Sequence, residues 1–281
     1  MACQLYARYV YKISKIIYNF SSIQLSGDIK MKKIFTILIC LLILPALSFA
    51  EEKQPTLIAD MWGVTPKAGH EAQLHAALKA HTKFREEKND PRSWQILTPI
   101  VGKHMNSYII RACCFEWSSQ DAYAEWSKSS GVQKHWRETA DPHVASYNHN
   151  FIETDAKNSH WPADTVVNYV GLTRYKVKNS SWKKLNKAIS SLSSIAKDNK
   201  WPHSWSWGYP VSGHTDMVLA IPFENYAAMA PLEENFFSFI SKQLKSEKKA
   251  QKMFDGFTSS IESSHYTIYK HLKDLSMKPK K

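Results

Sequence analysis

The stretch that decides the fold prediction spans positions 91–102 and reads PRSWQILTPIVG. A second stretch, at positions 202–213, reads PHSWSWGYPVSG. Both follow the pattern Pro-x-Ser-Trp, four residues, Pro, two residues, Gly, without a gap. The same offset of 111 positions pairs apolar residues upstream, for example Leu74 with Leu185. A self-match at a fixed period predicts a duplicated structural unit.

The first fifty residues have the features of an export signal. A short basic start, an apolar run at 34–44 and small residues up to Ala50 predict a signal peptide over residues 31–50, because the run is too short for a membrane span. An uncleaved amino-terminal anchor is the alternative. Residues 1–30 are interpreted as an over-extended start, with translation beginning at Met31. The expected product is periplasmic or secreted and has no membrane span after signal cleavage.

The charge pattern argues against a nucleic-acid partner. The formal net charge is +12, yet the basic residues are spread along the chain, apart from a cluster at 242–252 and the basic tail at 276–281. Nucleic-acid binding requires a concentrated basic face, usually within a recognisable module. The pattern instead indicates solvated helix surface and a frayed tail.

Two adjacent cysteines, Cys113 and Cys114, follow the predicted signal peptide. Neighbouring residues on a strand point to opposite faces of a sheet, so we expect these two not to pair with each other. A chain with so few cysteines is not a disulfide scaffold, even in an oxidising compartment.

The hydrophobic pattern predicts the same order of elements twice: strand, helix, strand, strand, helix, strand. In the first half, strands are expected at 57–64, 93–100, 108–117 and 147–154, with helices at 70–87 and from 118 towards 140. In the second half, strands are expected at 166–175, 203–210, 217–223 and 266–272, with a helix at 182–197 and a helical region at 225–260 broken near Pro231.

This order is the ferredoxin-like βαββαβ arrangement, in which one sheet face carries the helices and the other is uncovered. Two copies can bury their uncovered faces against each other. The fold prediction is therefore α+β, with two ferredoxin-like repeats forming one pseudo-symmetric α+β barrel. The predicted boundaries are 51–154 for the first repeat, 155–164 for a linker, 165–275 for the second repeat and 276–281 for the tail.

By this element order and the internal repeat, the chain resembles the dimeric α+β barrel superfamily, which includes the antibiotic-biosynthesis monooxygenase and NIPSNAP-like groups. It looks like a version with both halves fused. The resemblance implies a range from cofactor-free monooxygenases and haem-degrading enzymes to proteins without known chemistry. No catalytic motif of these families occurs in the sequence. Whether one chain stays a monomer or assembles further is left open.

Strand alternation selects candidate ligand-binding residues, because residues at every second position share a face. In the two repeats these candidates are Arg92, Trp94, His203, Trp205, Trp207 and Tyr209. We expect them to line the space between the two sheets, where aromatic rings, an imidazole and a guanidinium could hold a flat, apolar or anionic molecule. The alternative is that this aromatic face is simply core.

Further candidates lie at the lumen or its rim. Asp60 and Arg111 are charged residues inside apolar strands, so each must either meet a partner or face water. Asp60 could act as a base in the lumen, but an ion pair is the favoured interpretation. His104 and His214 occupy corresponding hairpins and could approach the mouth of the barrel.

Metal binding is not predicted. The chain has 12 histidines, but they are loosely spaced, and neither a His-Glu-x-x-His nor a Cys-x-x-Cys pattern occurs. A single axial histidine for haem would leave no sequence signature, so a haem cofactor is an option without support from a motif.

Three functions follow from the sequence. The first is an exported protein that binds a small hydrophobic or aromatic molecule between its two sheets. The second is an enzyme, either a cofactor-independent monooxygenase or a haem-binding or haem-degrading protein. The third is a structural duplicate without a ligand.

Overall fold

The computed structural model describes residues 56–213 and 215–279. The predicted start at 1–30, the predicted signal peptide at 31–50 and His214 lie outside the described residues. Within the described part of the chain, no helix is both long enough and apolar enough to cross a membrane.

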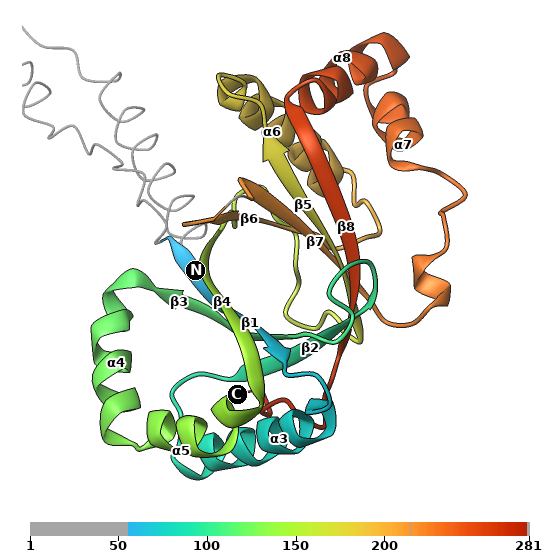
Figure 1. Ribbon diagram of the computed structural model, residues 1–281. Coiled ribbons are helices and arrows are strands. Elements are labelled where there is room, and N and C mark those ends of the chain that lie inside the picture. Colours follow the sequence, from blue (N-terminus) through green and yellow to red (C-terminus); the bar gives the residue numbers. More distant parts are fainter. Residues whose placement is uncertain (1–55, 214, 280–281) are drawn as a thin grey trace, which may run out of the picture. The chain divides into compact units, whose positions relative to one another are not determined.

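From Leu57 to Thr154 the structure contains four strands and three α-helices (Figure 1). In chain order these are β1 (Leu57–Pro66), α3 (Glu71–Glu87), β2 (Trp94–Val101), β3 (Tyr108–Glu116), α4 (Gln120–Ser129), α5 (Val132–Thr139) and β4 (Val144–Thr154). The irregular helical region expected from residue 118 onward is the pair α4 and α5, separated at Gly131. The φ of Gly131 is 82°, a left-handed conformation that glycine adopts without steric cost.

The second half repeats this order of strands and α-helices without an addition. Its elements are β5 (Tyr169–Val177), α6 (Trp182–Asp198), β6 (Ser206–Pro210), β7 (Met217–Phe223), α7 (Phe236–Gln243), α8 (Glu247–Thr258) and β8 (Ile261–His271). Helices α7 and α8 replace the single broken helix expected at 225–260. Each begins at a side-chain cap, where Asn235 and Ser246 accept a bond from a backbone N–H.

The eight strands form one closed antiparallel barrel in the order β1-β3-β2-β8-β5-β7-β6-β4. Within the first half the order is β4-β1-β3-β2, and within the second it is β8-β5-β7-β6. The halves therefore have the same strand order, and the pairings β2–β8 and β4–β6 close the ring. The fold is α+β, built from two ferredoxin-like halves as the element pattern predicts. A duplication in the history of the chain stays a prediction.

The helices cover the outer surface of the barrel, with α3–α5 on one half and α6–α8 on the other (Figure 1). Alternate strand residues therefore belong to two different cores. Val64 and Ile96 face outward and pack on Leu74 and Leu78 of α3. Their sequence neighbours face inward, and Leu97 packs there on strands of the second half.

The loop between the halves is held against the sheet. His160 forms an isolated antiparallel bridge with Trp205, and the backbone N–H of Asp155 donates to the carbonyl of Trp207. The indole of Trp205 also donates to the carbonyl of Asn158 at 2.7 Å. The two backbone bonds between Trp205 and His160 pair Trp205 with the loop just before β6, and β6 begins at Ser206, later than the strand expected at 203–210.

The expectation that Cys113 and Cys114 do not pair is wrong, because the structure places a disulfide between them. The β1–β3 register shifts at this point: Ile58 lies opposite Phe115, but Asp60 lies opposite Ala112. Two residues of β3 thus face one residue of β1, as in a β-bulge, and the simple alternation of faces is lost. Both cysteines consequently lie at the inner surface of the barrel.

Candidate functional site

Three cavities of ligand size lie in the described part of the molecule. The aromatic pocket, of about 500 Å³, lies between the sheet and helices α6–α8. The ion-pair pocket, of about 380 Å³, lies between the sheet and helices α3–α5. The lumen, of about 530 Å³, lies inside the barrel. Ligand sites in proteins typically have volumes of about 300–1,000 Å³, so each is large enough for a small molecule.

The expectation that the aromatic candidates line the space between the sheets is wrong in its choice of face. Trp94 lines the ion-pair pocket, and His203 and Trp205 line the aromatic pocket. Trp207 lines the aromatic pocket and also borders the lumen. On β2 and β6 the alternate positions Gln95, Leu97, Ser206 and Gly208 face the lumen, so the rings between them face the helices. Tyr209 lies outside the aromatic pocket.

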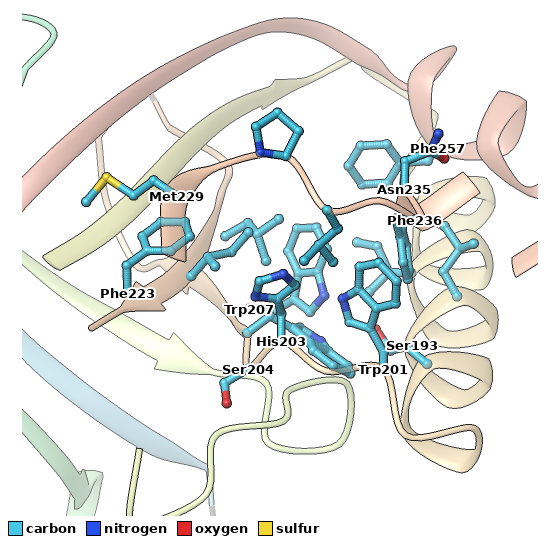
Figure 2. Close-up of a pocket in the computed structure, with 18 of the residues that line it drawn as sticks. Ser193, Trp201, His203, Ser204, Trp207, Phe223, Met229, Asn235, Phe236 and Phe257 are labelled. Carbon is cyan, nitrogen blue, oxygen red and sulfur yellow. The ribbon is translucent and has the colours of Figure 1, made fainter. Parts of the chain in front are cut away.

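The aromatic pocket is lined almost entirely by apolar groups (Figure 2). Helix α6 forms one wall, strands β6 and β7 form the floor, and helices α7 and α8 close the remaining side. Its aromatic side chains are Tyr175, Trp201, Trp205, Trp207, Phe223, Phe236, Phe254 and Phe257. Such a lining offers a large area for stacking to a flat apolar molecule.

A few polar groups reach this apolar space. The ring of His203 lies among Trp201, Trp207 and Phe223 in Figure 2, and burial lowers its pKa. At neutral pH the imidazole is therefore uncharged and can accept a proton or a hydrogen bond. The indole N–H groups of Trp201 and Trp207 have no acceptor within the described residues, so a ligand oxygen could take that place.

The apolar character of this pocket follows from two positions that differ between the halves. The offset of 111 residues places His203 at the position of Arg92 and Gly171 at the position of Asp60. The second half thus has neither the guanidinium of Arg92 nor the carboxylate of Asp60, which form an ion pair in the first half. A side chain at Gly171 would collide with the hydroxyl of Tyr266. The polar pair therefore has no counterpart in the aromatic pocket.

A buried ion pair borders the corresponding pocket of the first half. Nη1 of Arg92 donates to Oδ2 of Asp60 at 3.0 Å, and only 6% and 9% of the two side chains are exposed. Oδ1 of Asp60 also contacts Nε2 of His149 at 2.9 Å. The guanidinium stacks on Phe115 and Tyr123, 3.6 Å and 3.5 Å from their ring centres. Asp60 is thus the ion-pair partner favoured above and does not line the lumen.

His81 lies deeper in the ion-pair pocket, with both ring nitrogens engaged. Nε of Arg85 donates to its Nε2 at 2.8 Å, so Nδ1 carries the proton and faces Nδ1 of His135 at 3.1 Å. Burial, together with the nearby charges of Arg85 and His135, lowers the pKa of His81 to about 2. The folded protein holds this imidazole neutral.

Acidification is expected to destabilise the protein through His81. Below the ordinary histidine pKa of about 6.5, His81 binds a proton in the unfolded chain but not in the folded protein. The free energy of unfolding therefore decreases as the pH is lowered. Between pH 7 and pH 5 the loss from this residue alone should be about 2 kcal/mol. His81→Gln should remove that part of the pH dependence, measured by urea denaturation at both pH values. An equal loss in the variant and the wild type would contradict the assignment.

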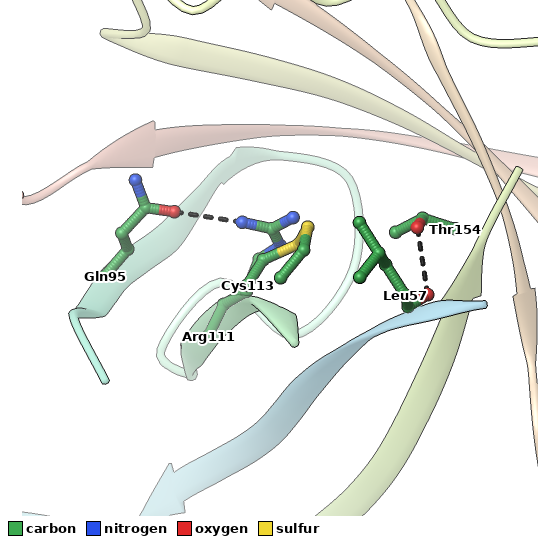
Figure 3. Close-up of a disulfide and its surroundings, with 6 residues drawn as sticks. Leu57, Gln95, Arg111, Cys113 and Thr154 are labelled. Atoms are coloured by element: carbon green, nitrogen blue, oxygen red, sulfur yellow. Dashed lines mark hydrogen bonds between the residues drawn. A yellow bond between two sulfur atoms is a disulfide. The ribbon is translucent and has the colours of Figure 1, made fainter. Parts of the chain in front are cut away.

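The described lining of the lumen includes an arginine but no aspartate or glutamate, which is not the case for the other two cavities. Arg111 lies on its wall, and its Nη1 donates to Oε1 of Gln95 at 3.1 Å (Figure 3). The two residues are direct cross-strand partners in the β2–β3 ladder. Burial lowers the pKa of Arg111 to about 10. The guanidinium is therefore charged at neutral pH, but it lies in a poorly solvated position.

His104 lies in the exposed β2–β3 hairpin and borders a shallow recess there, away from the lumen. Sequence reasoning missed Gln95 and His271 in the lumen, as well as Trp201, Phe236 and Phe257 in the aromatic pocket. The alternation that selected Trp94 also marks Gln95 for the other face. The phenylalanines come from separate helices, and no local pattern joins them.

Haem fits none of the three cavities. The aromatic pocket offers the imidazole of His203, but its described lining contains no lysine or arginine to meet two propionates. His271 in the lumen is hydrogen-bonded through both nitrogens, to the carbonyl of Val167 and the hydroxyl of Ser276. His81 is engaged on both nitrogens as well. In the described ranges, no group of three or more His, Cys, Asp and Glu side chains is placed to hold a metal ion.

Comparisons with known proteins place the fold but not the chemistry. No family model matches the chain, and no curated protein matches it. A candidate monooxygenase from Fusobacterium nucleatum has a similar structure, with a TM-score of 0.51 at 10% identity over 78% of this chain and 94% of that one. This likeness shows the fold alone.

Two further structures are similar at a lower score. A candidate monooxygenase from Lactobacillus acidophilus matches 77% of this chain and 94% of its own, at 11% identity and a TM-score of 0.49. A mutant chlorite dismutase from Candidatus Nitrospira defluvii matches 79% and 92%, at 6% identity and a TM-score of 0.45. Neither adds to the assignment of the fold.

Proposed function

We propose that this is an exported protein that binds a small, flat, apolar molecule in the aromatic pocket. The observation that carries the proposal is a cavity of about 500 Å³ with a nearly continuous aromatic and aliphatic lining. The expected ligand is an aromatic compound with one hydroxyl or carbonyl oxygen. His203 can bond a hydroxyl, and the free indole N–H groups of Trp201 and Trp207 can bond an oxygen acceptor.

Filling the pocket tests this proposal. Ala228 lines the pocket from the β7–α7 connection, whereas its neighbour Ala227 is exposed and does not line it. With 2-naphthol as the probe, wild type and Ala227→Trp should show a saturable rise in melting temperature and quenched tryptophan fluorescence. Ala228→Trp should lose at least about tenfold in affinity, because the new ring occupies the ligand's space. Equal binding by both variants would place the ligand elsewhere.

A second candidate function is cofactor-independent oxygenation, and the neutral imidazole of His203 is what favours it. A phenol stacked in the pocket could give its proton to His203, and a ring carbon of the resulting anion would then form a C–O bond to O2. The imidazolium would return the proton to the peroxide, and the hydroperoxide would lose water to give a quinone, so that the substrate itself supplies the electrons. The similar structure from Fusobacterium nucleatum is named as a candidate monooxygenase, although likeness at 10% identity extends only to the fold.

Oxygen uptake separates the two candidates. An oxygenase should consume oxygen with 2-naphthol, and His203→Gln should abolish this consumption while 2-naphthol still binds. A binding protein should consume none, and His203→Gln should only weaken binding.

Export is tested separately by cell fractionation. When the full chain is expressed, the recovered product should lie in the periplasm or the medium and should begin near residue 51. Recovery of an uncut chain in the cytoplasm would remove export from the proposal.

A further inference from the structure

Arg111 is a partly buried cation for which the described part of the protein supplies no counter-ion. Its hydrogen bond to Gln95 comes from an uncharged amide oxygen. The side chains lining the lumen include no aspartate or glutamate among the described residues. A charge removed from water normally requires a partner of opposite sign, because desolvation is expensive. A guanidinium is never relieved of its charge by deprotonation at physiological pH.

The guanidinium faces the cavity and is not sealed inside the wall. It is enclosed by protein, yet Arg111 keeps some accessible surface, and that surface borders the lumen. In Figure 3 it extends along the inner side of the sheet towards Gln95, next to the sulfur of Cys113. One of its five N–H groups is used by Gln95, so the others can bond a ligand.

The opposite half of the barrel provides space for the rest of such a ligand. The repeat offset places Ser206 at the position of Gln95, and the cross-strand partner of Ser206 is Ala220, as Arg111 is the partner of Gln95. Both of these small residues line the lumen, and so does Gly208. The first half therefore presents a charged group where the second half presents only small ones.

Apolar side chains surround most of the remaining volume. Leu57, Leu97, Ile109 and Ile152 line the first half, and the second half adds Val170, Leu172 and Val218. A free inorganic anion would leave this surface in contact with trapped water. An anion with an apolar body would cover it, and burying that body would contribute to binding.

We propose that the lumen is a second ligand site, distinct from the aromatic pocket, which binds a small amphipathic carboxylate with its carboxylate on Arg111. The guanidinium makes a charge-assisted, bidentate contact, for which its planar geometry is suited. Gln95 holds the guanidinium in place, and the apolar body of the ligand lies towards Ser206 and Ala220.

The test compares 2-naphthoate with its neutral amide, 2-naphthamide, by isothermal titration calorimetry. The protein carries Ala228→Trp, which blocks the aromatic pocket, so that the measured heat comes from binding in the lumen. In this background 2-naphthoate should bind at least about tenfold more tightly than 2-naphthamide, because a charged hydrogen bond is stronger than a neutral one. Adding Arg111→Met should reduce the affinity for 2-naphthoate at least tenfold and leave 2-naphthamide unchanged.

A matched substitution separates this effect from a general loss of positive charge. Arg174 lies on β5, bonds the hydroxyl of Tyr269 and does not line the lumen. Arg174→Met should leave 2-naphthoate binding unchanged. Arg111→Met should fold, because methionine needs no counter-ion. Arg111→Lys gives a second measure, since it keeps the charge and should retain part of the affinity.

Two results would overturn the proposal. One is equal affinity for 2-naphthoate and 2-naphthamide, and the other is unchanged 2-naphthoate binding in Arg111→Met. Failure of the lumen site is distinguishable from failure of the proposed function, because 2-naphthol binding to the aromatic pocket is measured without the Ala228→Trp substitution. Each site can be lost while the other is kept.

Discussion

Replacing Asp60 by alanine is expected to lower the free energy of unfolding by about 3–5 kcal/mol. The substitution removes the carboxylate from a pair whose side chains are 9% and 6% exposed, and it leaves the guanidinium of Arg92 buried. Arg92 would keep the amide of Gln120 and the two stacked rings, but it would lose its charged partner. Its pKa, already lowered chiefly by burial, shows how weakly water solvates this position.

The double variant Asp60→Leu, Arg92→Met separates the charge from the shape of the site. Removing both charges leaves no uncompensated ion, so most of the lost stability should return. Glu262→Gln serves as the surface control, because its pair with Lys176 is about half exposed and should leave the urea midpoint where it was. A double variant as unstable as Asp60→Ala would show that packing, and not the unpaired charge, causes the loss.

Asp90→Ala is expected to have a similar effect, a loss of about 3–5 kcal/mol, because three elements meet at this fully buried carboxylate. Oδ2 accepts from Nη1 of Arg85 on α3 at 2.6 Å and from the indole of Trp94 on β2 at 3.1 Å. The hydroxyl of Tyr123 on α4 donates to the same atom at 3.3 Å. Without the carboxylate, Arg85, Trp94 and Tyr123 would each lose this acceptor at a site that water reaches poorly, and that loss lowers the free energy of unfolding.

Asp90→Asn tests whether the charge or only the acceptor matters. The amide keeps one oxygen for the donors but no charge for Arg85, so its loss should lie between that of alanine and zero. Asp164→Asn, in an exposed loop, should leave stability unchanged. Urea denaturation followed by tryptophan fluorescence is suited to all these variants. If Asp90→Ala unfolded at the wild-type urea concentration, the network would not stabilise the fold.

The repeat at 91–102 and 202–213 was sufficient to predict the barrel. The order of strands and helices depends on local periodicity, and that order leaves few ways to bury both sheets. Strand β7 begins and ends where the pattern predicts it. Strand β6 does not, because its first residues are paired with the loop at His160, and such a pairing has no local signal.

The site was harder to predict, and the reason is geometric. A period of two tells which residues share a face, but it does not tell which face lies inside the barrel. The pattern groups Trp94, Trp205 and Trp207 on one face, and all three line pockets on the helix side, although Trp207 also borders the lumen. The sizes of their neighbours contain part of the missing information: Ser206 and Gly208 alternate with the large rings of β6 and line the lumen, where eight strands leave space for small side chains and one small ligand.

The Cys113–Cys114 pair shows a different limit. Alternation predicts that neighbours point apart, and the β-bulge that overrides it depends on the partner strand. Asp60 and Arg92 are 32 positions apart in the sequence. The pattern could therefore predict that Asp60 has an ion-pair partner, but it could not identify that partner as Arg92.

Among the described residues that line the lumen, Arg111 is the one arginine, and this has a consequence for symmetry. A barrel closed by two identical chains has a twofold axis through its centre, and each residue on the wall must appear twice. An arginine at this position would then face its own copy across the cavity, with no room left for an uncharged end of a ligand. One continuous chain is free of that constraint. It can keep a positive pole at one end of the interior and an uncharged pole at the other, and so bind an asymmetric molecule in one orientation.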